Sequence, residues 1–405
     1  MKGLSETPRR RYLIVIAALG AIALGCGENQ ELPASTHAVP GTPASVDEVP
    51  VLTVGSAAGD TLQELYRVIT PFLTPDGRLV VPLASDRTIR VFASDGRFLT
   101  ALGRPGEGPG EFGNIGGAWL RGDTIEAFDS QLRRITRFGP DGSVDVVNLD
   151  RNAPIQGIVP GAVADGWILV RVAGREEPES KEAELSRRDD IIVDHFGRHG
   201  AYLGEVARTL GMARFRSPVW NGFDPLSPRS VLQVGNGLLH VAETLTARIR
   251  MLEPDGTIRN EVTWTPEGVE AVAEVVASVI DSVVSEEPAE QADRTRARWE
   301  AAPAPEQLSV WWDYLVDPEG FIWVRPYEPF RHAAALGGFG TGSYVLGGNG
   351  QGGRWIVVSP EEGAVGEIEL PAALNPVQIT SHAVVSVERD TLGVESVHVY
   401  RLVRH

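Results

Sequence analysis

Residues 78–103 read RLVVPLASDRTIRVFASDGRFLTALG and decide the fold, because they hold three short β patterns joined by tight turns. Asp95 and Gly96 join the last two patterns, and this pair favours a hairpin turn because glycine adopts positive φ without steric cost. Residues 123–147 (DTIEAFDSQLRRITRFGPDGSVDVV) and 237–262 (GLLHVAETLTARIRMLEPDGTIRNEV) repeat this layout. Repeats of a few strands and tight turns are typical of a β-propeller. We therefore expect an all-β fold.

The β patterns divide the chain into six units and predict a six-bladed β-propeller over residues 49–405. The predicted units span residues 66–103, 115–149, 155–206, 230–264, 308–370 and 376–403. The sixth unit has only three strand patterns, whereas residues 49–55 form a single β pattern before the first unit. Pairing this N-terminal strand with the sixth unit would close the ring and cover an open sheet edge.

One segment breaks the β pattern. Within residues 266–301, Val272, Val276, Val279 and Val283 follow a helical spacing. The sequence therefore predicts a helical insertion near residues 267–300, with a second helix near its end. Two roles remain open for it: a cover over one face or edge of the body, or a lid or partner surface.

The N-terminus reads as an export signal. Arg9, Arg10 and Arg11 precede an apolar run over residues 12–25, which is short for a membrane span, and Cys26 follows directly. Residues 1–25 resemble a lipoprotein signal peptide, which would leave lipid on Cys26; the alternative is an ordinary secretory signal with an incidental cysteine. Residues 26–48 are rich in Gly, Pro, Ser, Thr and Ala, which predicts a flexible tether.

Composition limits the partners. The formal net charge is −17, and an acidic surface repels phosphate backbones, so we expect no nucleic-acid partner. Cys26 is the only cysteine, so no disulfide can form within the chain. We expect an exported protein attached to the membrane by its lipid alone, on the periplasmic face of the cell envelope. Gly27 follows the cysteine where an Asp would signal retention, which favours the outer membrane.

A family resemblance supports the propeller. Residues 103–112 (GRPGEGPGEF), together with residues 122–129 and 134–138, resemble bacterial six-bladed β-propeller lipoproteins related to the NHL-repeat group. Residues 390–402 look like the closing unit of the same family. The resemblance implies the fold over most of the chain from Val49 onward. It implies no catalytic residue, since the related propellers include binding scaffolds, lyases and lactonases.

The candidate site follows from propeller topology. Ligands of propellers usually bind at the mouth of the central channel, where connections enter the innermost strands. The residues that this placement selects are Arg67, Asp129, Gln156, Arg229, Trp311 and Tyr327. Two arginines in an acidic body favour an anionic ligand. Trp311 opens an aromatic cluster, residues 311–314, that is either core packing or a stacking wall for a sugar, peptide or aromatic ligand.

Two functions fit these observations. The first is a binding or scaffold module that captures an envelope protein or a small ligand at the channel face, without a cofactor. The second is a lyase or lactonase-type enzyme with a divalent metal, such as calcium, in the channel. The Asp-Gly turns lack the spacing of a calcium loop, so no metal-ligating residue is predicted.

Overall fold

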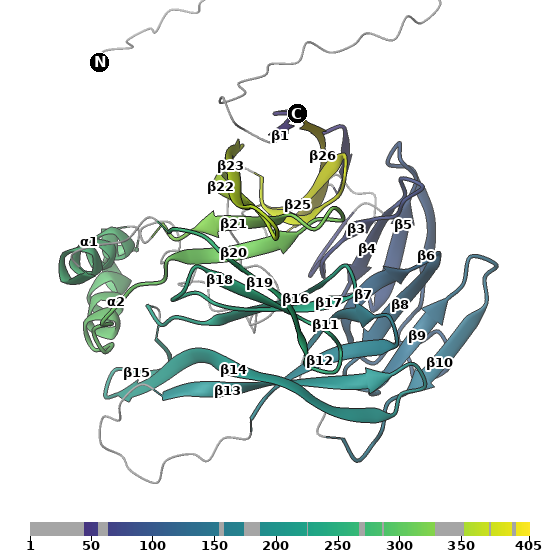
Figure 1. Ribbon diagram of the computed structural model, residues 1–405, viewed down its shortest axis with the longest axis horizontal. Coiled ribbons are helices and arrows are strands. Elements are labelled where there is room, and N and C mark those ends of the chain that lie inside the picture. Colours follow the sequence, from purple (N-terminus) through teal and green to yellow (C-terminus); the bar gives the residue numbers. More distant parts are fainter. Residues whose placement is uncertain are drawn as a thin grey trace, which may run out of the picture. The chain divides into compact units, whose positions relative to one another are not determined.

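The computed structural model describes ten segments, all inside one compact unit that spans residues 36–405. These segments are residues 44–55, 64–153, 158–173, 187–224, 226–266, 272–285, 287–328, 352–371, 374–390 and 394–405. They form six antiparallel sheets and two helices, and the sheets are arranged as the blades of a propeller (Figure 1). The predicted fold class, a six-bladed β-propeller with a helical insertion, is confirmed.

The first two blades have the plain four-stranded form. Blade one consists of β3 (Phe72–Leu73), β4 (Leu79–Leu83), β5 (Thr88–Phe92) and β6 (Phe98–Leu102). Blade two consists of β7 (Ile115–Arg121), β8 (Thr124–Asp129), β9 (Arg134–Phe138) and β10 (Val144–Asn148). The predicted Asp-Gly hairpin turns are present, with a φ of 84° at Gly96 and 81° at Gly142. In both turns the preceding aspartate accepts a hydrogen bond from the backbone N–H two residues later.

Blade three is longer than predicted. It consists of β11 (Ile158–Val163), β12 (Gly166–Val172), β13 (Arg187–Gly197), β14 (Tyr202–Ser217) and β15 (Trp220–Phe223). The predicted end near residue 206 is therefore wrong, because β14 continues beyond it and pairs with a fifth strand. The first part of β14 lies at the outside of the sheet and is exposed or half-buried throughout. Residues 207–217 were missed because Gly211 and several arginines interrupt the apolar alternation, although Met212, Ala213 and Phe215 there are buried.

Blades four and five flank the helices. Blade four consists of β16 (Ser230–Gly235), β17 (Leu238–Glu243), β18 (Arg248–Leu252) and β19 (Ile258–Thr263). Blade five consists of β20 (Trp311–Val316), β21 (Ile322–Pro326), β22 (Gly353–Ser359) and β23 (Gly363–Leu370). Helices α1 (Val272–Ser285) and α2 (Ala289–Glu300) lie in the connection between the two blades.

Blade six closes the ring with both ends of the body. It consists of β24 (Pro376–Ile379), β25 (Ala383–Arg389), β26 (Glu395–Arg404), β1 (Ala44–Val46) and β2 (Leu52–Val54). As predicted, the N-terminal strand joins the sixth unit, with Leu52 opposite Val399 in the β2–β26 register. A further strand, β1, also pairs with β26 and lies inside residues 26–48, the predicted tether. Cys26 and the leader lie outside the described residues.

Six apolar clusters hold the ring together, and each lies between two neighbouring blades. For example, Leu52 and Val385 of blade six share a cluster with Leu79 of blade one. The remaining clusters join blades one and two, two and three, three and four, four and five, and five and six. Since the stability of each blade depends on its neighbours, the ring is one cooperative core.

Buried carboxylates add polar links between blades. Glu126 of blade two accepts hydrogen bonds from the indole nitrogens of Trp119 at 2.8 Å and of Trp167, in blade three, at 2.7 Å. Asp317 of blade five accepts one from Arg404 of blade six at 2.7 Å. Because these carboxylates are almost fully buried, they depend on such donors.

Candidate functional site

All the predicted site residues that the structure describes lie on one face of the propeller, here called the connection face. On this face the connections enter the first strand of each blade and the second strand of each blade ends. The first strands of neighbouring blades, from β7 through β11, β16 and β20 to β24, contact one another in turn. They therefore surround the centre of the ring. Gln156 lies outside the described residues.

The two candidates on blades one and two do not join a common site. Asp129 is fully buried and accepts backbone hydrogen bonds from Gly113 at 2.7 Å and Leu132 at 2.9 Å, among others. Its carboxylate therefore holds the loop before β7 against the loop after β8. Arg67 is exposed, has a φ of 54°, and its carbonyl accepts a hydrogen bond from Ala84 at 3.1 Å.

The candidates on blades four and five do come together. Arg229 precedes β16 and is buried, with its guanidinium 3.8 Å from the ring centroid of Trp312. It also donates a hydrogen bond to the carbonyl of Trp312 at 2.8 Å. Tyr327, directly after β21, stacks on the same indole, with ring centroids 6.1 Å apart. These three side chains form the centre of a group that we call the junction cluster; its other members are Asp224, Asp313 and Arg325.

Asp313 brings a carboxylate between two buried guanidinium groups. It lies on β20, opposite Arg325 of β21, and both side chains are at most 3% exposed. Burial raises the pKa of Asp313 to about 6, although the charges of Arg325 and Arg229 act in the opposite direction. Burial lowers the pKa of Arg229, an effect that the charge of Asp313 partly offsets. The cluster therefore contains a carboxyl group that titrates near neutral pH.

Asp224 and Tyr327 extend the cluster toward the helices. Asp224 is 4% exposed, and burial raises its pKa to about 6, against one hydrogen bond from the backbone N–H of Leu226 at 3.0 Å. Burial also raises the pKa of Tyr327 to about 12, and the nearby charge of Asp224 acts in the same direction. Perturbed pKa values of this kind are common where proteins bind ligands or perform chemistry.

The helical insertion covers the cluster. Val279, Ile280 and Val283 on α1 and Trp299 on α2 are buried, and they pack with Leu226, Leu308, Trp312 and Tyr327 in one apolar cluster. The valine spacing that predicted a helix is thus the spacing of its buried face. Of the two predicted roles, the structure shows the cover; a role in access remains a prediction.

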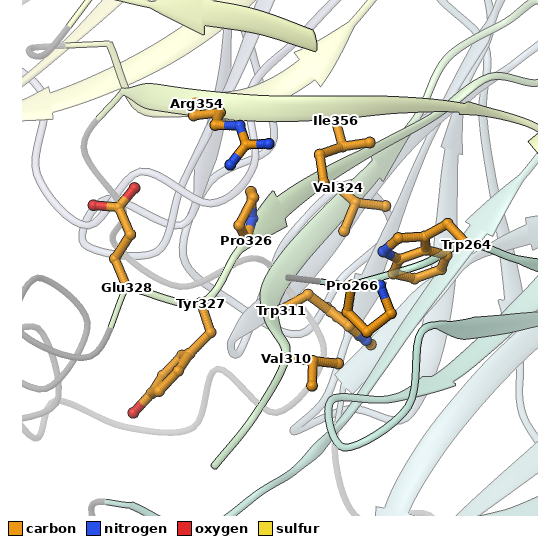
Figure 2. Close-up of a pocket in the computed structure, with 10 residues that line it drawn as sticks. All are labelled: Trp264, Pro266, Val310, Trp311, Val324, Pro326, Tyr327, Glu328, Arg354 and Ile356. Atoms are coloured by element: carbon orange, nitrogen blue, oxygen red, sulfur yellow. The ribbon is translucent and has the colours of Figure 1, made fainter. Parts of the chain in front are cut away.

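A pocket lies beside the junction cluster, between blades four and five (Figure 2). This junction pocket has a volume of about 230 Å³. Its lining residues are Trp264, Pro266, Val310, Trp311, Val324, Pro326, Tyr327, Glu328, Arg354 and Ile356. In Figure 2 the ring of Tyr327 points away from the other labelled side chains. Tyr327 therefore links the two features, with its ring in the cluster and its remaining atoms at the pocket.

Trp311 and Trp312 have different surroundings although they are adjacent in sequence. Trp311 is fully buried, packs on Tyr314 with centroids 5.7 Å apart, and donates a hydrogen bond to the carbonyl of Thr246 at 2.7 Å. The aromatic cluster is core packing, and Trp311 also lines the junction pocket. Its alternative role as a stacking wall for a ligand stays a prediction.

The sequence did not single out Asp224, Arg325, Glu328 or Arg354. Arg325 is the last residue of the β pattern of residues 321–325. A charged residue that continues an otherwise apolar strand is the signal that could have revealed it. Asp224 lies next to a turn, Glu328 follows a strand and Arg354 stands at the start of a strand. These residue types are ordinary at such positions, so the sequence offers no signal for them.

Within the described residues no three His, Cys, Asp or Glu side chains gather as metal ligands. The metal-dependent alternative stays a prediction.

Neither of the two described helices is long and apolar enough to cross a membrane.

Taken together, these features define a six-bladed β-propeller with a covered polar cluster and an adjacent pocket at one blade junction. A family model described as "6-bladed beta-propeller" matches residues 66–154, which span blades one and two. This match confirms the expected resemblance to six-bladed propeller proteins. No curated protein sequence matches this chain.

A comparison with solved structures finds similar chains at low sequence identity. A Bacteroides fragilis protein named as a candidate exported protein is 9% identical, with 91% of this chain and 98% of that chain covered and a TM-score of 0.46. A member of the duf4221 family from Bacteroides vulgatus is 10% identical, with 90% and 100% covered and a TM-score of 0.46. A catalytically inactive virginiamycin B lyase from Staphylococcus aureus, solved with quinupristin, is 9% identical, with 87% and 99% covered and a TM-score of 0.38.

Proposed function

We propose that this propeller is a ligand-binding module of the cell envelope, which captures its ligand non-covalently at the junction of blades four and five. The observation that carries the proposal is the junction pocket, which lies on the connection face and has mostly apolar and aromatic walls. Such walls with a few polar groups are the usual composition of small-ligand sites. The two buried carboxyl groups with a pKa of about 6 in the adjacent cluster support the same location.

The helical insertion fixes the walls of this site. Pro266 begins the connection that leads into α1, and Val310 ends the connection that follows α2; both residues line the pocket. Displacement of the helices would uncover Trp312 and Tyr327, and Tyr327 lines the pocket. In this proposal the insertion controls access to the ligand.

The envelope location rests on the leader. Arg9 to Arg11, the apolar run of residues 12–25 and Cys26 have the order of a lipoprotein signal. Lipid on the cysteine would anchor the propeller, since each buried methylene contributes roughly 0.8 kcal/mol to membrane binding.

A binding screen tests the proposal. The chain with Cys26→Ser, which carries no lipid, is screened against small one-ring compounds by ligand-observed NMR. Ile356→Trp fills the pocket and should abolish the binding found. Ile258→Trp is the matched control, because Ile258 is 54% exposed on β19 and does not line the pocket. Binding that survives Ile356→Trp, or a complete lack of ring binders, would contradict the proposal.

A further inference from the structure

The N-terminal strand enters the propeller at a defined face. β1 pairs antiparallel with β26, and Ala44 at the start of β1 lies opposite Arg404 at the end of β26 (Figure 1). The chain before Ala44 therefore leaves the body where β26 ends. A blade has two such ends: the connection face, and the opposite face, here called the turn face, where hairpin turns follow the first and third strands of the blades.

Contacts at both ends of β26 show which face this is. At its start, Glu395 accepts a hydrogen bond from the backbone N–H of Val68 at 2.6 Å, and Val68 lies in the connection that enters blade one. At its end, Arg404 donates a hydrogen bond to Asp317 at 2.7 Å, and Asp317 begins the turn between β20 and β21. β26 thus runs from the connection face to the turn face, and the chain before Ala44 leaves from the turn face.

The height of blade six separates the two faces. β26 contains ten residues, and a strand of this length spans about 30 Å at about 3.4 Å per residue. Residues 27–43, here called the linker, join Cys26 to Ala44. Their composition predicts a flexible chain, and a flexible chain of about 17 residues has a root-mean-square reach of about 23 Å. This reach is shorter than the blade.

An anchored linker of this length favours one orientation of the body. With the turn face nearer the bilayer, the linker starts close to the lipid surface and needs no extension. With the connection face nearer, Ala44 would lie about 30 Å above the surface, and the linker would have to extend beyond its mean reach and pass the rim of blade six. Full extension to about 60 Å would allow this, but it costs conformational entropy.

Resting on the proposed function, in which Cys26 carries lipid, we propose that the turn face is directed toward the membrane and the connection face away from it. The junction pocket lies on the connection face. Its ligand therefore comes from the aqueous compartment around the propeller, and the pocket is turned away from constituents of the bilayer.

The linker sets this orientation, and adhesion of the turn face to lipid does not. Exposed aspartates stand in four hairpin turns of the turn face: Asp95, Asp123, Asp141 and Asp255. They repel anionic headgroups within a screening length of about 8 Å at physiological ionic strength. The mean reach of the linker exceeds this distance, so a layer of water separates the turn face from the bilayer while the orientation is kept.

Two single-cysteine variants of the full lipidated chain test the orientation. Lipid occupies the sulfur of Cys26, so an added cysteine is the only free thiol. His199→Cys places a fluorescent label on an exposed turn of the turn face, between β13 and β14, and Arg151→Cys places it on the exposed connection after β10. Both positions belong to the surroundings of blade three, which lies across the ring from blade six. A propeller that rested on its blade-six rim would hold both labels away from the lipid.

Energy transfer to acceptor dyes on lipid headgroups measures the distance of each label from the bilayer. The labelled proteins are added from detergent to preformed phosphatidylcholine vesicles. We expect the His199→Cys label to lose more donor fluorescence than the Arg151→Cys label. Equal losses, or a larger loss at Arg151→Cys, would overturn the orientation and leave the membrane location intact. If the proteins do not sediment with the vesicles, the anchor itself is wrong, and the orientation and the envelope location fail together.

A longer linker assigns the orientation to its cause. A Gly-Ser insert that doubles the linker raises its root-mean-square reach to about 32 Å, close to the height of the blade. The difference between the two labels should then decrease. A difference that stays unchanged would mean that the turn face itself binds lipid, and it would overturn the role of the linker. The same labels on a chain that starts at Gly27 without lipid are the control and should show no transfer.

Discussion

Asp224→Asn should change the stability of the fold in a pH-dependent way. Burial raises the pKa of Asp224 from 3.8 to about 6 in the folded chain. The folded state therefore binds this proton more tightly than the unfolded state, and the contribution of Asp224 to stability falls as the pH rises from about 4 to about 6. A difference of about two pKa units corresponds to about 3 kcal/mol once the pH exceeds the folded pKa.

The variant removes the buried charge and keeps an oxygen for the backbone N–H of Leu226, which lies 3.0 Å from the carboxylate. The new amide adds a cost of about 1–3 kcal/mol if it lacks a partner, but that cost does not depend on pH. The informative quantity is thus the change in stability, variant minus wild type, compared between two pH values. Between pH 4.5 and pH 7.5 this difference should shift in favour of the variant by about 2 kcal/mol.

Urea unfolding followed by tryptophan fluorescence measures this quantity at each pH. Asp123→Asn is the matched control, because Asp123 is an exposed aspartate in the turn between β7 and β8. The control should show the same stability difference at both pH values. The reasoning would be refuted if Asp224→Asn showed no such shift, or a shift that favours the wild type at pH 7.5. Either result would mean that ionisation of Asp224 does not destabilise the folded state.

Four further outcomes follow from the structure. Leu52→Asp should destabilise the ring by more than about 3 kcal/mol in urea unfolding, because it buries a charge in the closure; Val51→Asp, at a position 60% exposed, should cost less than about 0.5 kcal/mol. Glu126→Ala should cost about 3 kcal/mol in the same assay, since it leaves buried indole and guanidinium donors without their acceptor. Trp299→Ala should cost about 3–5 kcal/mol if the insertion unfolds with the body, or release the helices to proteolysis if it does not. A chain that starts at Gly27 behind a cleavable secretory signal without a lipid-accepting cysteine should move from the membrane fraction to the soluble fraction, as seen by immunoblot.

The fold could be predicted because its signals are local. A hairpin turn such as Asp95-Gly96 depends on the φ that its glycine adopts, and strand alternation depends on neighbouring residues. Ring closure was also predictable. The last unit has only three strands and a single strand precedes the first unit, so the simplest arrangement pairs that strand with the last unit. The observed register, Leu52 opposite Val399, is that pairing. The part of β14 beyond residue 206 was missed because Gly211 and neighbouring arginines interrupt its apolar pattern, although Met212, Ala213 and Phe215 are buried.

The site could be predicted only in part. Topology placed Arg229 and Tyr327 on the connection face, where the junction cluster lies, since the strand directions of a propeller determine which connections share a face. It did not reveal that Arg229 reaches the carbonyl of Trp312, a residue 83 positions later in the chain. Nor did it reveal the burial of Asp224 or of Asp313. Burial at a junction of two blades and two helices is set by contacts between segments distant in sequence, and a single sequence does not contain them.

Blades of a propeller share one backbone plan, and an interruption of that plan gives one junction surroundings that the other junctions lack. Both described helices lie in the connection between β19 and β20, and this is the junction that contains the cluster and the pocket. The helices bury Trp312 and Tyr327, and at the same junction two carboxyl groups acquire a pKa of about 6. Burying ionisable groups lowers stability, and an apolar junction of the same shape would avoid that cost. Proteins keep such local costs mainly where they serve function, so the interruption supports the proposed placement of the site at this junction.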